Sequence, residues 1–326
     1  MFLVPWFKSI QNIKLSPMTL FLLFINLMCF AYLGPSSLKV DAQLEKFFDN
    51  SALVEAQAVL YSKFVVEHGE NYSESVLGIS EKVLSGQISH QKKMVGLSFR
   101  DYDFMSKIPL KGDTSPLPLD EVTYKYWTQE IDHWVSYLQH SSGMLWGLSL
   151  WNMSVMNYIT YQFVHANFFH LFMNMFFLVL FGSLLEPIVG SIGIFVLYIV
   201  SGFIGALGFH WISGLSALPL IGASGSVSGL LGVVVALYWS RNLHYFYWIL
   251  PAKEYFGFTY LPAWILLILF ASMDLSGLLG VPPEFGGTAH GAHLSAMAFG
   301  LLLGLGLRSI LKRVNDLVYL GSEASP

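Results

Sequence analysis

The residue best suited to nucleophilic chemistry is a serine in a glycine-rich turn. Ser224 lies within Ile-Gly-Ala-Ser-Gly-Ser-Val-Ser-Gly, residues 221–229. Gly222 and Gly225 allow the backbone to turn tightly before a helix begins. A serine placed there sits at a helix N-terminus, where unpaired backbone N–H groups can bind an anion. The sequence therefore predicts a hydroxyl group beside an anion site.

A histidine on a later segment can supply a base for this serine. His293, Ala296, Gly300 and Gly304 are spaced by three, four and four residues, so the imidazole tops a stripe of small residues. Small residues at a spacing of four also follow Ser224, which is typical of close helix contacts in membranes. We expect the two stripes to pack together and to bring the serine and the histidine to the same end.

Donors for a developing oxyanion come from a third segment. His170 and Asn174 are four residues apart and share one face of a predicted helix, while His165 lies five residues earlier at its mouth. Nucleophilic catalysis needs a base within hydrogen-bond reach of the serine. It also needs hydrogen-bond donors for the oxyanion. The sequence supplies each part once, which favours hydrolysis through a serine.

A metal site is the competing chemistry. His290 and His293 could join one of the two earlier histidines around zinc, but zinc hydrolases usually add a carboxylate as ligand or base. The only acidic residue that we place well inside an apolar segment is Glu186, twelve residues after Asn174. On a helix this separation is about 18 Å. The sequence therefore disfavours metal hydrolysis, and it predicts neither a metal nor an organic cofactor.

The composition indicates where these residues lie. Of 326 residues, 54% are hydrophobic and only 12% are charged, against about 25% charged residues in soluble domains. This balance excludes a disordered chain, a nucleic-acid binder that acts through bulk charge, and an ordinary soluble enzyme. A single cysteine, Cys29, excludes an intrachain disulfide and a cysteine metal site. The chain is therefore predicted to be a membrane protein.

The charges are concentrated in one segment. Residues 36–136 contain 10 of the 17 Lys and Arg residues and 15 of the 21 Asp and Glu residues. Apolar side chains share one helix face in two of its stretches: Leu53, Ala56, Leu60 and Phe64, and then Tyr124, Trp127, Ile131, Trp134 and Leu138. We find no catalytic spacing in this segment. It is predicted to be a polar helical insert on the outer side of the membrane.

The remaining apolar segments define six predicted spans. They cover residues 17–33, 167–187, 191–212, 224–240, 257–274 and 289–308. A cleaved signal peptide is the alternative for the first, but that run is long for one and is followed by Gly34-Pro35. Outside the insert, the basic residues are Lys8, Lys14, Arg241, Lys253, Arg308, Lys312 and Arg313. With six spans, all of them fall on one side, so both termini are predicted to be cytoplasmic.

Together these motifs resemble the rhomboid family of intramembrane serine proteases. The matching pieces are Pro17-x-Thr19 with Asn26, His165-x4-His170-x3-Asn174, Glu186-x3-Gly190, Gly222-x-Ser224-Gly225, and Ala292-His293 with Gly300. The resemblance covers roughly residues 16–34 and 145–312, in the family's order. It implies an all-α, six-helix transmembrane bundle whose active site opens to the outside. The insert lies in the first outer loop, outside the resemblance.

The resemblance also implies a role for each matching residue. Ser224 matches the nucleophile and His293 the general base, a dyad with no acidic third member. His170 and Asn174, together with the Ser224 backbone N–H, match the oxyanion-binding groups. The supporting set comprises a structural histidine before the second span, the glycines of the turn, and a histidine near the base: His165, Gly222, Gly225 and His290. Glu186 matches a structural carboxylate at the cytoplasmic end.

Three positions depart from the family's pattern. The Trp-Arg pair usual in the first loop is replaced by Met156-Asn157. The aromatic residue that commonly stacks on the catalytic imidazole is Ser228, and a glycine usual after the base is Ala296. None of these changes removes a catalytic atom. The missing aromatic residue is expected to leave His293 less well held, which would affect efficiency more than chemistry.

The sequence thus predicts an intramembrane serine endopeptidase that cleaves transmembrane segments of other proteins near their outer end. The alternative is a non-proteolytic rhomboid-like protein that binds membrane clients. The expected partners are transmembrane protein substrates and the lipid bilayer, and neither nucleic acid nor metal. Because the chain lacks an Arg-rich transit segment, we expect a multi-pass protein of a bacterial plasma membrane. The predicted units are residues 1–35, the insert 36–136, the catalytic core 137–312 and the tail 313–326.

Overall fold

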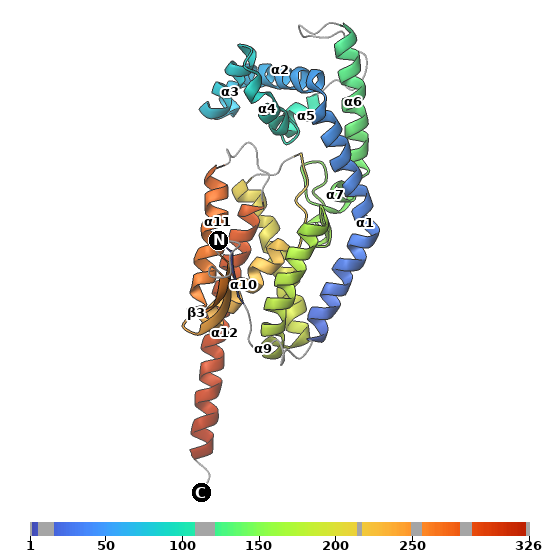
Figure 1. The fold of residues 1–326 in the computed structure, drawn as a ribbon. Helices are drawn as coiled ribbons and strands as arrows, with labels where there is room; N and C mark the ends of the chain where they lie inside the picture. The colour runs from blue at the N-terminus through green and yellow to red at the C-terminus, as the bar shows by residue number, and fades with distance from the viewer. Residues whose placement is uncertain are drawn as a thin grey trace.

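The chain is mostly helical, with long apolar helices side by side and a smaller helical region at one end (Figure 1). The computed structural model describes residues 2–5, 16–107, 121–213, 217–248, 256–280 and 289–323. The last described helix, α12 (His290–Glu323), ends at the opposite end of the molecule from residues 51–107 (Figure 1). Lys8, Lys14 and Lys253, which contributed to the predicted orientation, lie outside the described residues.

Helix α1, Pro17–Asp49, is longer than the predicted span 17–33 because it continues through Gly34-Pro35. Proline inside a helix removes one backbone hydrogen bond and disturbs the preceding turn. Here the hydroxyls of Ser36 and Ser142 both donate to the carbonyl of Leu33, at 2.8 and 3.0 Å. These bonds hold the turn beside Pro35, so the helix leads without interruption from the apolar bundle into the polar insert.

Helix α9, Phe168–Gly208, consists of two helical stretches that meet at Gly190. Gly190 has φ 75°, a left-handed value that favours glycine, and Pro187 precedes it inside the helix. The two stretches correspond to the predicted spans 167–187 and 191–212. A single π-helical turn, Phe209–Ser213, follows α9. The predicted boundary between the two spans therefore lies where the backbone changes direction.

Helices α10, Ser224–Tyr238, and α12, His290–Glu323, pack closely through their small residues. A Cβ atom at Gly300 would overlap the carbonyl of Gly229, and one at Gly232 would overlap the carbonyl of Met297. Backbones approach this closely only where side chains are absent. The predicted contact between the two small-residue stripes is confirmed.

The predicted span 257–274 is wrong in its position. Helix α11 covers Trp264–Gly280, whereas Phe256–Pro262 forms strand β3. The aromatic-rich sequence of β3 suits a strand, and the residue before Pro262 is biased away from helical conformation. The helix therefore begins after the proline and extends six residues beyond the predicted end.

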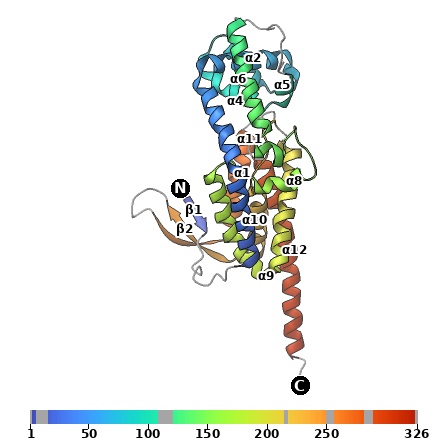
Figure 2. The ribbon, with the colours of Figure 1, turned by 90° about the vertical axis from the view of Figure 1, so that its right-hand side faces the viewer.

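A small antiparallel sheet was not anticipated from the sequence. Strand β2, Asn242–Trp248, pairs with β3 in the register Asn242 to Pro262 and Trp248 to Phe256. Strand β1, Phe2–Pro5, pairs with the other edge of β2. The sheet projects to one side of the helices (Figure 2). The N-terminal residues thus lie against a hairpin between α10 and α11.

The insert has a hydrophobic core of its own. Its helices are α2, Ser51–Glu67; α3, Glu74–Leu84; α4, Gln91–Ser98; α5, Tyr102–Lys107; and α6, Glu121–Gln139. Trp127, Ile131 and Trp134 of the predicted apolar face are buried. Burial raises the pKa of the Tyr61 and Tyr72 hydroxyls, which stay protonated and both donate to Asp101. The described residues between positions 36 and 136 are therefore mostly helical.

Short elements within the insert and in the segments that follow it complete the description. They are the 3-10 turns η2, Gly69–Asn71, η3, Ile88–His90, and η4, Tyr161–Phe163, together with helices α7, Ser142–Trp146, and α8, Asn157–Thr160. The backbone N–H of Ala217 donates to the carbonyl of Arg100 at 3.0 Å. The insert is therefore tied to the segment that leads into α10.

The helices of the bundle expose large apolar side chains. Phe24, Phe172, Ile192 and Leu302 are each at least half exposed. Among the described residues, three helices are long and apolar enough to cross a membrane: Pro17–Ser36, Phe168–Ile212 and His290–Leu311. The helices Ser224–Tyr238 and Trp264–Leu279 are shorter but equally apolar. Apolar surface on such helices is suited to lipid, and the chain is an integral membrane protein.

Candidate active site

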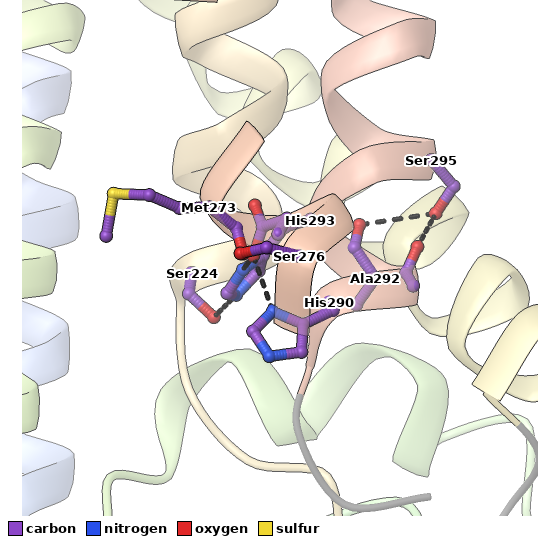
Figure 3. A network of polar contacts seen from close by, with 9 residues as sticks. Ser224, Met273, Ser276, His290, Ala292, His293 and Ser295 are labelled. Atoms are coloured by element: carbon purple, nitrogen blue, oxygen red, sulfur yellow. Dashed lines mark hydrogen bonds and ion pairs between the residues drawn. The ribbon is translucent and has the colours of Figure 1, made fainter. Parts of the chain in front are cut away.

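Ser224 and His293 form a hydrogen bond between two helices that are far apart in the chain. Ser224 Oγ and His293 Nε2 are 2.7 Å apart. Ser224 is the first residue of α10, and His293 lies in the first turn of α12. Figure 3 shows the two side chains facing one another, with His290 beside them. The close packing of α10 against α12 thus puts a hydroxyl within reach of an imidazole that can accept its proton.

The turn before α10 presents this serine. Gly222 has φ 115°, which favours glycine, and its N–H donates to the Tyr161 carbonyl at 2.9 Å. A Cβ atom at Gly225 would lie 2.7 Å from the Tyr161 hydroxyl, which itself donates to the Gly202 carbonyl. Gly222 therefore serves a tight turn, whereas Gly225 leaves room for the Tyr161 hydroxyl. The Ser224 N–H, at the first helical position, belongs to the set without an intrahelical acceptor.

His170 and Asn174 lie beside the same turn, at the start of α9. Asn167 caps this helix by accepting from the His170 N–H at 2.9 Å. The His170 ring lies so close to Gly222 that a Cβ atom there would be 2.6 Å from the ring. Asn174 donates from its side chain to the His170 carbonyl at 2.9 Å. The structure thus brings both predicted oxyanion donors to the serine.

A cavity of about 520 Å³ joins these four side chains. Ser224, His293, His170 and Asn174 all contribute to its lining. Its other walls are largely apolar and include Phe177, Phe270 and Met273. A mostly apolar cavity with a few convergent polar groups is typical of a binding site. The arrangement offers apolar space for substrate side chains beside a serine, a base and donors.

An aspartate adjoins the pair, which the sequence analysis did not expect. Asp274 of α11 is only 7% exposed, and its Oδ1 accepts from Nδ1 of His293 at 2.8 Å. The expectation that no acidic residue stands beside Ser224 and His293 is therefore wrong. The reason is that the fifth span was placed too early, which put Asp274 at its edge, whereas α11 continues to Gly280. The available signal was an ionisable residue inside an apolar helix, which points to function by default.

A known family model matches the region of the chain that contains this cavity. Residues 152–310, which contain all the residues of the cavity named above, match the family model described as the Rhomboid domain. This part of the chain is a rhomboid domain. A search of curated proteins found no match. Rhomboid proteins are typically intramembrane serine proteases, although members of the family without protease activity exist.

Two further histidines of the rhomboid domain have different surroundings. His165 is buried behind His170, with ring centroids 5.3 Å apart, and its Nε2 lies 3.4 Å from the Ala223 N–H. His290 lies one turn before His293, and its Nδ1 is 2.8 Å from Asp274 Oδ1. The His290 ring packs against Gly277, where a Cβ atom would overlap it. His165 thus supports the turn before Ser224, and His290 restrains Asp274.

The aspartate also changes the argument about metals. Ligand atoms of Asp274, His290 and His293 lie within 4.8 Å of one another. A metal was disfavoured because no carboxylate was expected near these histidines, and that expectation is wrong. The same imidazole and carboxylate atoms are joined in the structure by hydrogen bonds of 2.8 Å. A metal ion would have to replace these bonds, and chelation experiments can test for one.

The three departures from the family's pattern have local explanations in the rhomboid domain. Asn157 donates from its side chain to the carbonyls of Gly147 and Leu145, at 2.7 and 3.2 Å, and so ties its loop together. Ser228 lines the cavity one turn after Ser224 and offers no ring to the imidazole. Ala296 is fully buried between α12 and α10. Of these positions, only Ser228 lines the cavity that contains His293.

Glu186 lies outside the cavity of the rhomboid domain. Its carboxylate accepts from the backbone N–H groups of Met18 and Thr19, both at 2.9 Å. The hydroxyls of Thr19 and Ser191 also donate to it, at 2.8 and 2.7 Å. The carboxylate thus satisfies free donors at the N-terminus of α1 and ties this helix to α9.

Proposed function

We propose that this protein is an intramembrane serine endopeptidase that cleaves transmembrane segments of other membrane proteins near their outer end. The observation that carries the proposal is the 2.7 Å hydrogen bond between Ser224 Oγ and His293 Nε2, beside the mostly apolar cavity. A base within hydrogen-bond reach is the requirement for a nucleophilic serine. The rhomboid domain supports the same chemistry.

The reaction we infer has two halves. Ser224 Oγ attacks the scissile carbonyl carbon while His293 Nε2 takes the hydroxyl proton, and His293 then gives that proton to the leaving amine. Water next attacks the acyl-serine ester, again with His293 as base, which releases the new carboxyl group and restores Ser224. In both halves His170, Asn174 and the Ser224 N–H donate to the negatively charged oxygen.

The membrane arrangement we propose follows from the charge distribution. The bundle has six spans, and both termini lie in the cytoplasm of a bacterial cell, with the protein in the plasma membrane. The units are residues 1–35, the extracytoplasmic insert 36–136 in the first outer loop, the catalytic core 137–312 and the tail 313–326. The site then opens toward the outer face, which allows water to reach the acyl-enzyme. Accessibility of cysteines introduced at Glu70 and Ser322 to a membrane-impermeant reagent tests this orientation.

The experiment that tests the proposed activity is cleavage of a panel of single-span model substrates in liposomes. Wild-type protein is expected to cut at least one substrate near its outer end, and both Ser224→Ala and His293→Ala are expected to cut none. A panel left intact by correctly folded wild-type protein would contradict the proposal. Cleavage that survives Ser224→Ala and is lost on chelation would assign the reaction to a metal at Asp274, His290 and His293.

The second candidate is a protein that binds membrane clients without cutting them, because non-proteolytic rhomboid relatives exist. A fluorophosphonate probe separates the two functions, since it reacts only with an activated serine. The proposed protease function predicts that the probe labels the wild-type protein and does not label Ser224→Ala. A folded wild-type protein that takes no label, yet captures single-span proteins from detergent solution, would favour the binding function.

A further inference from the structure

We propose that Asp274 is a positioning residue for His293 and the third member of a Ser224–His293–Asp274 triad. The proposal rests on the serine protease function proposed above. It differs from the dyad without an acidic member that the family resemblance implies. The observation behind it is a continuous chain of hydrogen bonds, 2.8 Å from Asp274 Oδ1 to His293 Nδ1 and 2.7 Å from His293 Nε2 to Ser224 Oγ.

The carboxylate of Asp274 selects the tautomer of the imidazole. An ionised carboxylate can only accept hydrogen bonds, so the hydrogen between Asp274 and His293 belongs to Nδ1. A neutral imidazole then has its lone pair on Nε2, which faces the serine hydroxyl. This is the tautomer that a general base requires. With Nε2 protonated instead, His293 would offer Ser224 a donor and could not take its proton.

The same carboxylate also fixes the orientation of the imidazole ring. Ser228, which lines the same cavity as His293, has no ring that could stack on the imidazole. The bond to Asp274 fixes the plane of His293 from the opposite nitrogen. Asp274 itself is held by His290, whose Nδ1 donates to the same Oδ1. Three helices therefore fix one geometry, since Ser224 comes from α10, Asp274 from α11 and both histidines from α12.

The carboxylate also balances the charge that forms on His293 during the reaction. When His293 takes the proton from Ser224 it becomes positive, and a negative carboxylate one hydrogen bond away stabilises it. The interaction is strong where surrounding groups are apolar and water is limited. Asp274 takes up no proton in this scheme: the proton moves from Oγ to Nε2 and then to the leaving amine. The carboxylate therefore acts only through His293.

A purely structural role is the alternative for Asp274. A buried carboxylate in an apolar helix is costly unless it is paired, and the bond to His290 alone would already join α11 to α12. Such a role would not require the additional bond to His293. The two roles differ in what a substitution changes: loss of a structural bond lowers stability, whereas loss of a positioning bond lowers the rate in folded protein.

The experiment compares Asp274→Asn with Glu186→Gln, which changes a second buried carboxylate away from the cavity. For each purified full-length variant, kcat and KM are measured on a model substrate that wild-type protein cuts, and folding is checked by thermal denaturation. We expect Asp274→Asn to lower kcat by up to about 10⁴-fold, the loss seen for this change in other serine proteases. We expect a KM within a few-fold of the wild-type value, and a wild-type kcat for folded Glu186→Gln.

The pH dependence of kcat supplies a readout that a structural role would not move. Among the residues that the structure describes, the titratable groups that face His293 are Asp274 on α11, His290 on α12 and His170 on α9. Of these, the carboxylate is the one that favours the protonated imidazole. Asp274→Asn should therefore move the acid limb of the kcat profile as well as lower its plateau.

A second pair of variants covers the case in which Asp274→Asn does not fold. The side chains introduced by Asp274→Glu and Asp274→Gln have the same length and differ in charge. The Glu variant is expected to have the higher kcat. Wild-type kcat and an unmoved acid limb in folded Asp274→Asn would overturn the triad, as would equal rates for the Glu and Gln variants. A wild-type protein that neither cleaves nor takes a fluorophosphonate label would instead overturn the proposed function.

Discussion

Asp274 and Glu186 are two buried carboxylates in apolar helices, and their partners differ in kind. Glu186 accepts from two backbone N–H groups and two hydroxyls, none of which changes its protonation near neutral pH. Asp274 accepts from two imidazoles, which do change theirs, and it lines a cavity. The first arrangement holds helices together, and the second can take part in proton transfer. Burial of a charged side chain in a membrane protein therefore does not by itself indicate catalysis. The hydrogen-bond partners of that side chain distinguish a structural role from a catalytic one.

The largest effect expected from this comparison is on the base itself. His293→Ala should lower kcat by roughly 10⁴–10⁶-fold, as loss of the base does in other serine proteases, because Ser224 then has no acceptor for its proton. Thr19→Val, which removes a hydroxyl donor from Glu186, should leave kcat unchanged. Single-turnover cleavage of a model substrate measures both. A comparable rate loss in folded Thr19→Val would contradict the distinction between the surroundings of Glu186 and those of Asp274.

The next effect is on stability at the Glu186 end. In Glu186→Gln the amide group would face N–H and O–H donors, and each unmet buried donor costs about 1–3 kcal/mol. We expect a lower midpoint of thermal denaturation in detergent and an unchanged rate per folded molecule. Thr19→Val is the graded control and should lose less stability, since the two backbone donors remain. A wild-type midpoint for Glu186→Gln would show that the carboxylate does not anchor α1.

A third prediction concerns the helix contact that brings Ser224 to His293. A methyl group at Gly300 would overlap the Gly229 carbonyl, so Gly300→Ala should destabilise the protein by about 1–3 kcal/mol and lower the labelling rate of Ser224. Gly306 lies on the same helix and has no neighbour within 4 Å of an added Cβ. Gly306→Ala is therefore the matched control and should lower neither the stability nor the rate of Ser224 labelling. Equal behaviour of the two variants, measured by thermal denaturation and labelling, would contradict the packing argument.

The smallest effect is expected at His290, which acts on Asp274 and not on the serine. His290→Gln keeps a donor near the carboxylate, so we expect a loss of about fivefold in kcat, the equivalent of one ordinary hydrogen bond of about 1 kcal/mol. Steady-state kinetics at several pH values measures this. A loss as large as that of His293→Ala would mean that His290 is itself the base, and that the hydrogen bond to Ser224 has been assigned the wrong role.

The part of the site that could be predicted consists of residues with a local signature. The turn of Gly222, Ser224 and Gly225 is contiguous in sequence, and His170 and Asn174 have helical spacing. The approach of Ser224 to His293 followed from two stripes of small residues, because such stripes allow helices to pack closely. Each of these inferences needed only the spacing within one segment and a general rule for helix packing.

The missed features depend on position in space. Asp274 has no motif around it, and its importance arises only when α11 packs against α12. A span placed a few residues too early was enough to hide it. Strands β2 and β3 were missed because Phe256–Pro262 was read as part of an apolar helix, although its cross-strand partners are aromatic-rich. Helix α1 was predicted to end at Gly34-Pro35, but it continues. Its continuation could not be predicted from the local sequence, because the stabilising hydroxyl of Ser142 comes from a segment more than 100 residues later.

The most direct test of the account is the rate at which a fluorophosphonate labels Ser224 in four proteins side by side. We predict rapid labelling of the wild-type protein and of folded Glu186→Gln, much slower labelling of Asp274→Asn, and none of Ser224→Ala. This pattern would establish an activated serine that depends on the carboxylate of α11 and not on the carboxylate of α9. Absence of labelling in the wild-type protein, or labelling that persists in Ser224→Ala, would contradict the account.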